Sequence, residues 1–262
     1  DLVGRGAAEA RTPRALAERS DIVFLCVTSS AQVEAVVRGA EGLAAGLKTG
    51  SVIVDCSTAD PNSTLALAAE LAPKGIAYCD APLGGTPAQA EEGKLSAMVG
   101  ADSAVFARIR PVCEAWAQKV THLGPVGDGH KMKLINNFLS MGYGAIYAEA
   151  LALAKKVGIS PQIFDSVIRG SRMDSGFYQT FMAYVLDRNR EAHKFTLVNA
   201  LKDMRYLEAL ADGASFANPI GNAVKNSYAL ACAAGLEEGY VPMLSDVIAK
   251  LNGVSLVDVR GA

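Results

Sequence analysis

The chain has 262 residues, of which 50% are hydrophobic, and a formal net charge of −2. This apolar content is enough for one large or two modest domains, and the absence of a basic stripe argues against a nucleic-acid partner. No apolar run reaches the roughly 18 residues that a membrane-spanning helix needs, and no secretory signal opens the sequence. Five cysteines without a C-x-x-C pair argue against a metal site and favour reduced thiols. We therefore expect a cytoplasmic protein that binds neither nucleic acid nor membrane.

The first half alternates short apolar runs with helical patterns. The apolar runs predict strands at residues 21–27, 50–55, 75–80, 95–100 and 119–123. Helical patterns occur at residues 32–38, 63–72 and 102–116. Near-continuous apolar strands separated by helices are typical of a parallel or mixed sheet that is covered on both faces. Cys26 falls within the first run, where we expect a small buried side chain.

The second half changes character after Gly129. From His130 to about Val157 the sequence has no proline and is rich in Ala, Leu, Ile and Met, which predicts one long helix that ends at Gly158. Further helical patterns follow at residues 161–170, 177–187, 198–213, 220–235 and 244–252. Because no strand pattern appears here, we expect an all-helical domain with the long helix as its spine.

A polar face interrupts the start of this apolar helix. Lys133, Asn136, Asn137 and Ser140 are spaced at i, i+3, i+4 and i+7, which places them on one side of a helix. A lysine on a buried face must be paired or have a lowered pKa, and this suits it to general acid/base chemistry. The same pattern also fits a solvated stripe, and the nearby Lys131 favours that alternative.

The G-x-G-x-x-x-K-x-x-N-N pattern of residues 127–137 resembles the 3-hydroxyacid dehydrogenase family. The family includes 3-hydroxyisobutyrate dehydrogenase, tartronate semialdehyde reductase and sulfolactaldehyde reductase, with 6-phosphogluconate dehydrogenase as a more distant relative. The resemblance implies that Lys133 is the catalytic acid/base and that Asn137 helps to hold the substrate. It also implies that Asn136 and Ser140 face the substrate.

Other segments resemble the family in the same order. The strand end Asp55-Cys56-Ser57-Thr58 matches a D-x-S-T element, and the loop of residues 80–86 matches its substrate loop. These matches imply substrate-binding roles for Ser57, Gly84, Gly85 and Thr86. The resemblance further implies cofactor-binding roles for Val27, Thr28, Thr58, Phe195 and Lys202.

The substrate loop also has a physical interpretation. Gly84 and Gly85 allow the backbone to approach a ligand, and successive N–H groups can cradle an anion such as a carboxylate. A plain tight turn is the alternative, because Pro82 and Pro87 favour one. In the sulfolactaldehyde reductase branch an arginine stands at the Gly85 position, and its absence makes a semialdehyde carboxylate a better fit than a sulfonate.

The expected fold is an α/β Rossmann-type dinucleotide-binding domain at residues 1–126, followed by an all-α substrate and dimerisation domain at residues 127–262. Such a sheet normally begins with a strand, a G-x-G-x-x-G turn and a helix, and this fingerprint is absent from the sequence. We therefore expect that the first βαβ unit, roughly 30 to 40 residues, is missing. The residue that selects NAD or NADP would lie in that segment.

The resemblance implies an NAD- or NADP-dependent oxidoreductase that interconverts a small 3-hydroxy acid, such as 3-hydroxyisobutyrate, and its semialdehyde. It also implies a homodimer or homotetramer. An imine reductase on the same scaffold is one alternative, although those relatives generally lack the lysine. A catalytically silent cofactor-binding protein is another. His130 would either tune Lys133 or be a surface histidine, and His122 is expected to be structural.

Overall fold

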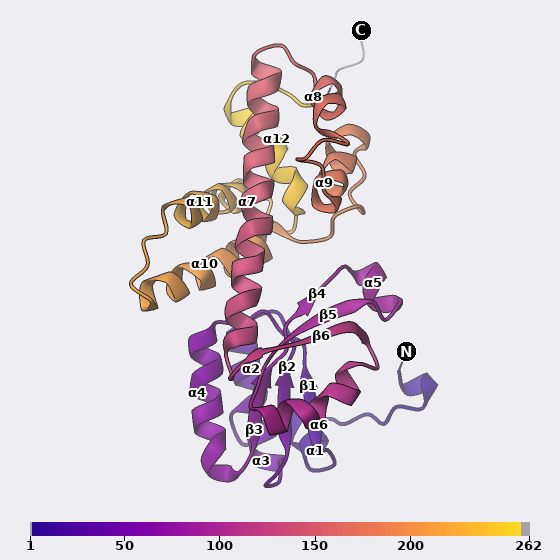
Figure 1. The fold of residues 1–262 in the computed structure, drawn as a ribbon, viewed down its shortest axis with the longest axis vertical. Helices are drawn as coiled ribbons and strands as arrows, with labels where there is room; N and C mark the ends of the chain where they lie inside the picture. Colours follow the sequence, from indigo (N-terminus) through magenta and orange to yellow (C-terminus); the bar gives the residue numbers. More distant parts are fainter. Residues whose placement is uncertain (1, 258–262) are drawn as a thin grey trace. The chain divides into compact units, whose positions relative to one another are not determined.

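Six strands of the chain form one mixed sheet (Figure 1). The computed structural model describes residues 2–257, which form two compact units that divide between Leu134 and Ile135. The strands all belong to the first unit. They are β1 Ile22–Leu25, β2 Val52–Asp55, β3 Ala77–Asp80, β4 Leu83–Gly84, β5 Leu95–Gly100 and β6 Ala117–Gly124.

The strand directions show a mixed sheet, one of the two arrangements that the sequence predicts. β1, β2 and β3 are parallel neighbours, so their carboxyl ends meet at one edge. β5 runs antiparallel to β3 and to β4, and parallel to β6. β2 is buried along its whole length, as its unbroken Val-Ile-Val run indicates.

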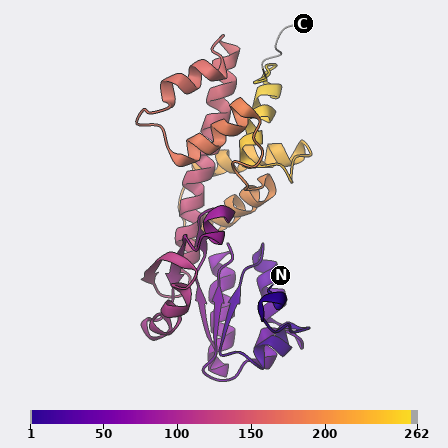
Figure 2. The ribbon, with the colours of Figure 1, turned by 90° about the vertical axis from the view of Figure 1, so that its right-hand side faces the viewer.

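Helices lie on both faces of this sheet (Figures 1 and 2). Two apolar clusters join the sheet to these helices. One cluster joins β1–β3 to the first four helices, and the other joins β2, β3 and β5 to the sixth. The helices of the first unit are α1 Pro13–Ala17, α2 Ser30–Val37, α3 Leu43–Gly46, α4 Pro61–Leu71, α5 Pro87–Glu91 and α6 Ser103–Cys113. Short 3-10 helices occupy Val3–Arg5 and Ala72–Lys74.

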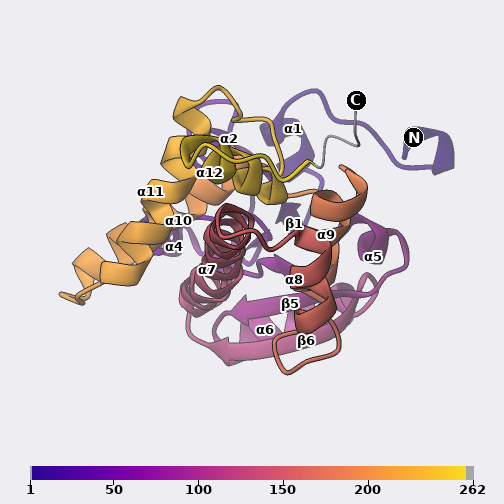
Figure 3. The same cartoon turned by 90° about the horizontal axis from the view of Figure 1, so that it is seen from above.

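The second unit is helical, as expected. The 29-residue α7, Asp128–Lys156, begins in the first unit and continues as the spine of the second. In the second unit, α8 Pro161–Ile168 and α9 Gly176–Asp187 lie on one side of α7, and α10 Leu197–Gly213 and α11 Pro219–Ala233 on another (Figures 1 and 3). A 3-10 turn at Val241–Met243 leads into α12 Leu244–Leu251.

Polar residues begin several of these helices. Ser29, Asp60, Ser160 and Thr196 each accept a backbone N–H at the start of α2, α4, α8 and α10. Proline at the first position of α4 and α8 adds a fixed φ angle that suits a helix start. These signals are local in sequence, which is why the helix positions were predictable.

The structure differs from the expectations at Cys26 and at several short elements, and it leaves the predicted domain division untested. Cys26 is exposed rather than buried, because β1 ends at Leu25 and the thiol lies in the following turn. α1, α3, α5 and β4 have no counterpart among the predicted elements. The predicted domain division at residues 126 and 127 remains a prediction. Residue 1 and residues 258–262 of those domains lie outside the described residues.

Candidate active site

The carboxyl ends of β1 and β2 are joined by the side chain of Ser57. The backbone N–H of Val27 donates to Ser57 Oγ over 3.0 Å, and the backbone N–H of Ser57 donates to Asp55 Oδ1 over 2.9 Å. Ser57 is therefore buried, at 2% exposure. Tyr78 on β3 donates its hydroxyl to Asp55 Oδ2 over 2.8 Å, and burial raises the pKa of this phenol. The Asp55 carboxylate thus holds the strand end in one conformation.

Short side chains remain accessible at this edge. Thr28 is exposed, while Val27 and Thr58 are half-buried. A doubly wound sheet binds its dinucleotide outside the carboxyl ends of its strands. Small and hydroxyl-bearing side chains at this edge would not obstruct a ring of the dinucleotide, and their hydroxyls can form hydrogen bonds with it. These three residues therefore fit the cofactor-binding role that the sequence implies, whereas Ser57 is turned inward.

The first turn of α7 is anchored to the end of β3. Asp80 Oδ1 accepts the N–H of Gly127 over 2.7 Å, and Oδ2 accepts the N–H of His130 over 2.6 Å. Burial raises the pKa of Asp80, and its hydrogen bonds oppose that rise. A Cβ at Gly129 would lie 2.4 Å from the carbonyl oxygen of Met98, so only glycine allows this close approach. The start of α7 is thereby fixed against the sheet.

This anchoring brings Lys133 to the loop that follows β3. Lys133 Nζ donates to the carbonyl oxygen of Leu83 over 2.7 Å. Lys133 is half-buried, so its ammonium reaches the loop from a helix that is already fixed at its first turn. The structure therefore joins the two most informative sequence segments, the lysine helix and the glycine loop, within one unit.

The loop itself is tightly packed. Gly85 has a φ of +127°, and a Cβ there would lie 2.8 Å from Leu95 Cδ2. A Cβ at Gly84 would lie 2.5 Å from Ser96 Oγ, which donates to the Gly84 carbonyl over 3.3 Å. Gly85 is thus required by its backbone conformation, whereas a side chain at Gly84 would displace the Ser96 hydroxyl.

Thr86 has a clear local role. Its hydroxyl accepts the N–H of Gln89, and the Gln89 side chain accepts the N–H of Thr86, which completes a capping box at the start of α5. Thr86 therefore starts a helix through its side chain. Its contact with substrate stays a prediction.

In the second unit, the predicted residues of α7 contact α10. Asn137 is buried and donates its Nδ2 to Asp203 Oδ2 over 2.7 Å. Asp203 Oδ1 also lies 3.1 Å from Lys202 Nζ. Asn136 is exposed and donates to Asn137 Oδ1 over 3.4 Å. Asn137, Asp203 and Lys202 therefore form one connected group.

The other predicted residues of this unit are less closely linked. Ser140 Oγ donates to the carbonyl oxygen of Asn136 over 3.2 Å. Phe195 is half-buried, and its carbonyl accepts the N–H of Val241 over 2.9 Å. Lys202 Nζ lies 5.4 Å from the centre of the Tyr206 ring, a cation–π distance.

Sequence reasoning missed two parts of the site. No role was predicted for Asp203, although its carboxylate holds the amide of Asn137. His130 is fully buried, so a surface position is wrong. The burial of His130 could not be predicted from sequence, because it depends on contacts with Asp80 and Thr64, which belong to elements far away in the chain. His122 stacks on Phe106 and hydrogen-bonds to the carbonyl oxygen of Ala101, in keeping with a structural role.

Residues 2–257 meet neither the requirements of a metal site nor those of a membrane-spanning helix. No cluster of three or more His, Cys, Asp or Glu side chains in this range is arranged to hold a metal ion. Within the same range, every helix is too short or too polar to cross a membrane.

Comparison with protein families places both halves of the chain. A profile described as the NAD binding domain of 6-phosphogluconate dehydrogenase matches residues 1–124. A second profile, described as NAD-binding of NADP-dependent 3-hydroxyisobutyrate dehydrogenase, matches residues 127–243. The order of the two matches agrees with the order of the sheet and the helical segment.

Individual proteins agree with these profiles. The 2-(hydroxymethyl)glutarate dehydrogenase of Eubacterium barkeri is 40% identical over 167 residues, which cover 64% of this chain and 56% of the relative. The L-threonate dehydrogenase of Cupriavidus necator is 30% identical over 235 residues, 88% of this chain and 77% of the relative. The chain thus spans little more than half the length of the first of these relatives.

A solved structure extends the similarity to the whole fold. The crystal structure of 3-hydroxyisobutyrate dehydrogenase from Salmonella typhimurium superposes with a TM-score of 0.83 and 26% identity. The match covers 94% of this chain and 86% of that one. On the two profiles, the L-threonate dehydrogenase and this structure, the chain belongs to the 3-hydroxyacid dehydrogenase family.

Proposed function

We propose that the chain acts in the NAD- or NADP-dependent interconversion of a small 3-hydroxy acid and its semialdehyde, with Lys133 as general acid/base. The observation that carries this proposal is the 2.7 Å hydrogen bond from Lys133 Nζ to the Leu83 carbonyl. It keeps the only lysine of the family pattern beside the glycine loop, where the substrate carboxylate is expected. The names of similar dehydrogenases support the same reaction class.

The chemistry required of Lys133 is proton transfer at Nζ. During oxidation, Nζ takes the proton of the substrate hydroxyl; during reduction, it returns a proton to the carbonyl oxygen of the semialdehyde. The Leu83 carbonyl accepts one N–H of Lys133 and so restricts the side chain to one orientation. This leaves the other positions on Nζ for the reacting oxygen.

A bound nicotinamide cofactor would supply the other half of the reaction, by accepting or donating the hydride. Val27, Thr28 and Thr58 would hold it at the carboxyl edge of β1 and β2. In the second unit we assign Phe195 and Lys202 to cofactor binding, following the family resemblance. The Asp203 carboxylate beside Lys202 fixes the position of its ammonium.

For the substrate we propose a small hydroxy acid or semialdehyde with a carboxylate. The N–H groups of Gly84 and Gly85 would bind the carboxylate, because such backbone segments favour anions and carry no bulky side chain. Thr86 would contribute its hydroxyl, because its N–H already donates to the Gln89 side chain. Asn137 would hold the substrate through its amide, with Asn136 and Ser140 on the same side of α7. Ser57 supports this region through Val27 rather than through an exposed hydroxyl.

We also propose a homodimer or homotetramer. α7 carries exposed apolar side chains at three- and four-residue spacing on one side, which is typical of a helix that packs against another helix. In the second unit these are Ile135, Leu139, Tyr143, Ile146 and Leu153. Five free cysteines support a cytoplasmic location.

The alternatives are weaker on the same residues. An imine reductase would not need an acid/base lysine at this position, so the well-placed Lys133 argues against it. A silent cofactor-binding protein would not need Lys133 and Asn137 to be held by dedicated partners. Neither alternative has a specific observation in its favour.

The experiment is an activity screen with the purified protein. NADH and NADPH oxidation would be followed with tartronate, succinate and methylmalonate semialdehydes, sulfolactaldehyde and a cyclic imine. Turnover of a semialdehyde that is lost in Lys133→Ala is the expected result. Turnover of the imine alone, or cofactor binding without any turnover, would contradict the proposal.

A further inference from the structure

His130 connects three separate segments of the first unit. Its backbone N–H donates to Asp80 Oδ2 at the end of β3. Its imidazole Nε2 lies 3.1 Å from the carbonyl oxygen of Ser57, and Nδ1 lies 2.7 Å from Thr64 Oγ1 on α4. The side chain is fully buried, at 0% exposure. A buried imidazole with both nitrogens hydrogen-bonded has only one orientation available to it.

The partners define what each nitrogen does. The Ser57 carbonyl is only an acceptor, so Nε2 must carry a proton and donate it. Nδ1 shares its hydrogen bond with the Thr64 hydroxyl, which is either donor or acceptor. A phenyl ring in place of the imidazole has no nitrogens, so the Ser57 carbonyl and the Thr64 hydroxyl would each lose a hydrogen-bond partner.

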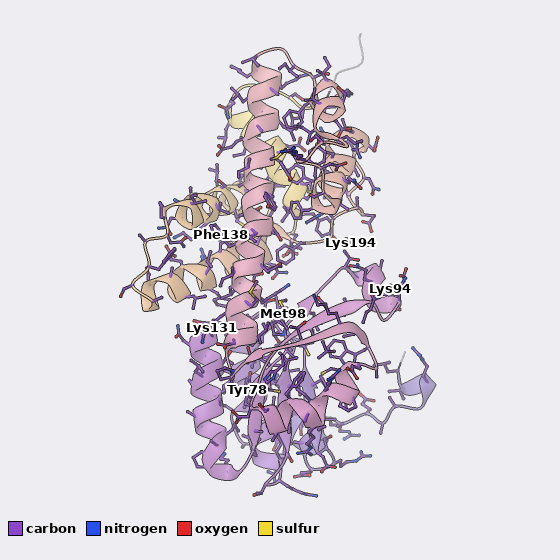
Figure 4. The ribbon with its side chains drawn as sticks, in the orientation of Figure 1. Tyr78, Lys94, Met98, Lys131, Phe138 and Lys194 are labelled. Atoms are coloured by element: carbon purple, nitrogen blue, oxygen red, sulfur yellow. The ribbon has the colours of Figure 1, made fainter. Side chains whose placement is uncertain are left out.

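Charged groups surround the same ring. Asp55 Oδ2 lies 3.9 Å from Nε2, and Asp80 Oδ2 lies 3.9 Å from Nδ1. Tyr78, which Figure 4 labels among the strands, donates a hydrogen bond from its hydroxyl to the Asp55 carboxylate. The imidazole therefore occupies a polar pocket beneath the carboxyl ends of β2 and β3, rather than an apolar core where size alone would matter.

These contacts form a continuous path along the strand ends. Val27 donates to Ser57 Oγ, the Ser57 carbonyl accepts from His130, and Lys133 follows His130 by three residues on α7. The edge assigned to the cofactor and the lysine assigned to proton transfer are thus tied together through one side chain. A shift of His130 would move Lys133, because both lie within one turn of a rigid helix.

We propose that His130 is a positioning residue that sets the placement of Lys133 relative to the carboxyl edge of β1 and β2. This inference rests on the proposed function, since it assigns a purpose to the position of Lys133. His130 acts through the helix and through Ser57, and it does not need to touch the substrate. Misplacement of a reacting group by about 1 Å lowers a rate by up to about 100-fold.

The test compares His130→Phe, which replaces the imidazole by a somewhat larger ring without nitrogens, with His130→Gln, which keeps one donor and one acceptor. His122→Phe is the matched control, because His122 also pairs an imidazole nitrogen with a backbone carbonyl in this unit. His130→Phe should lower kcat about 10- to 100-fold with cofactor KM within about threefold, and His130→Gln should regain most of the loss. His122→Phe should stay within about twofold.

A second measurement does not depend on turnover. Amide hydrogen exchange of residues 127–135 should be about tenfold faster in His130→Phe than in the unaltered protein, and unchanged in His122→Phe. Thr64→Val, a nearly isosteric change, should move exchange and kcat in the same direction by a smaller factor if His130→Phe fails to fold.

The outcomes separate the two proposals. Loss of kcat with faster exchange, both restored by Gln, supports the role of His130. Unchanged exchange in His130→Phe overturns it, as does a kcat loss that merely follows the folded fraction. If the unaltered protein turns over none of the substrates, the proposed function fails, while exchange still decides whether His130 anchors α7.

Discussion

Lys133 and Leu83 are 50 residues apart in sequence, yet Lys133 Nζ donates a 2.7 Å hydrogen bond to the Leu83 carbonyl. The contact depends on two features of the first unit. Asp80 fixes the start of α7 through the N–H groups of Gly127 and His130, and Gly129 allows the helix to approach β5. The position of Lys133 beside the loop therefore depends on contacts elsewhere in the unit and not only on its own hydrogen bond.

Gly85 should not tolerate a side chain. In Gly85→Ala, the φ of +127° and the 2.8 Å approach to Leu95 Cδ2 would strain the loop. We expect the free energy of unfolding to fall by about 1–3 kcal/mol and the KM for substrate to rise, both measurable by urea titration and steady-state kinetics. Gly142→Ala, where the added Cβ meets no atom within 4 Å, is the control and should be neutral or stabilising. Equal effects at the two glycines would contradict this explanation.

The Asn137 amide should matter for stability as well as for binding. Asn137→Leu removes the donor to the buried Asp203 carboxylate. We expect the free energy of unfolding to fall by about 1–3 kcal/mol, because a buried carboxylate loses a hydrogen bond. The exposed Asn136→Ala should change stability by less than about 0.5 kcal/mol. A stable Asn137→Leu variant would show that Asp203 is satisfied without this amide.

His193 should contribute a pH-dependent stability. Burial lowers its pKa from 6.5 to about 4, so the unfolded chain binds a proton more readily than the folded protein. Its contribution is complete above pH 6.5 and is lost as the pH falls toward 4. We expect the free energy of unfolding of the protein to drop by up to about 3 kcal/mol more than that of His193→Phe over this range. The free energies of unfolding are measured by urea titration at pH 7 and at pH 4.5. An equal decrease in the unaltered protein and in His193→Phe would contradict this explanation.

The apolar side of α7 should be an assembly surface. Ile146 and Leu153 are 60% and 65% exposed on this side. Ile146→Glu or Leu153→Glu should convert an oligomer into monomer, because a carboxylate at a packed helix interface costs several kcal/mol. Val112→Glu, at a 41% exposed position on α6, is the control. Light scattering after gel filtration gives the mass, and an unaltered protein that is already monomeric would refute the proposal.

The fold was predictable from sequence where the signal was local. β2 and β3 follow from short apolar runs, and α4 and α8 from a capping residue followed by proline. β4 was not predictable, since its two residues form a strand only by pairing with Ala97 and Ser96. The short α1 and α3 lack the length over which a helical period can be recognised.

The candidate site was predictable only as a set of residue types. The spacing of Lys133 and Asn137 placed them on one side of a helix. The partners of these residues are the Leu83 carbonyl and the Asp203 carboxylate, and neither is encoded by spacing. The burial of His130 depends on Ser57, Thr64 and Asp80, which the fold brings together from 50 or more residues away.

The most direct test of the central claim is the kcat of Lys133→Ala with the best semialdehyde of the screen, alongside Lys131→Ala. Lys131 pairs with Asp128 at the surface and lies two residues away on another side of α7, so it reports the loss of a nearby positive charge. We expect kcat to fall about 10²- to 10⁴-fold in Lys133→Ala, with NAD(P)H binding and folding intact. In Lys131→Ala, kcat should stay within about twofold of that of the unaltered protein. A Lys133→Ala variant that keeps its kcat would contradict the assignment of Lys133 as the acid/base.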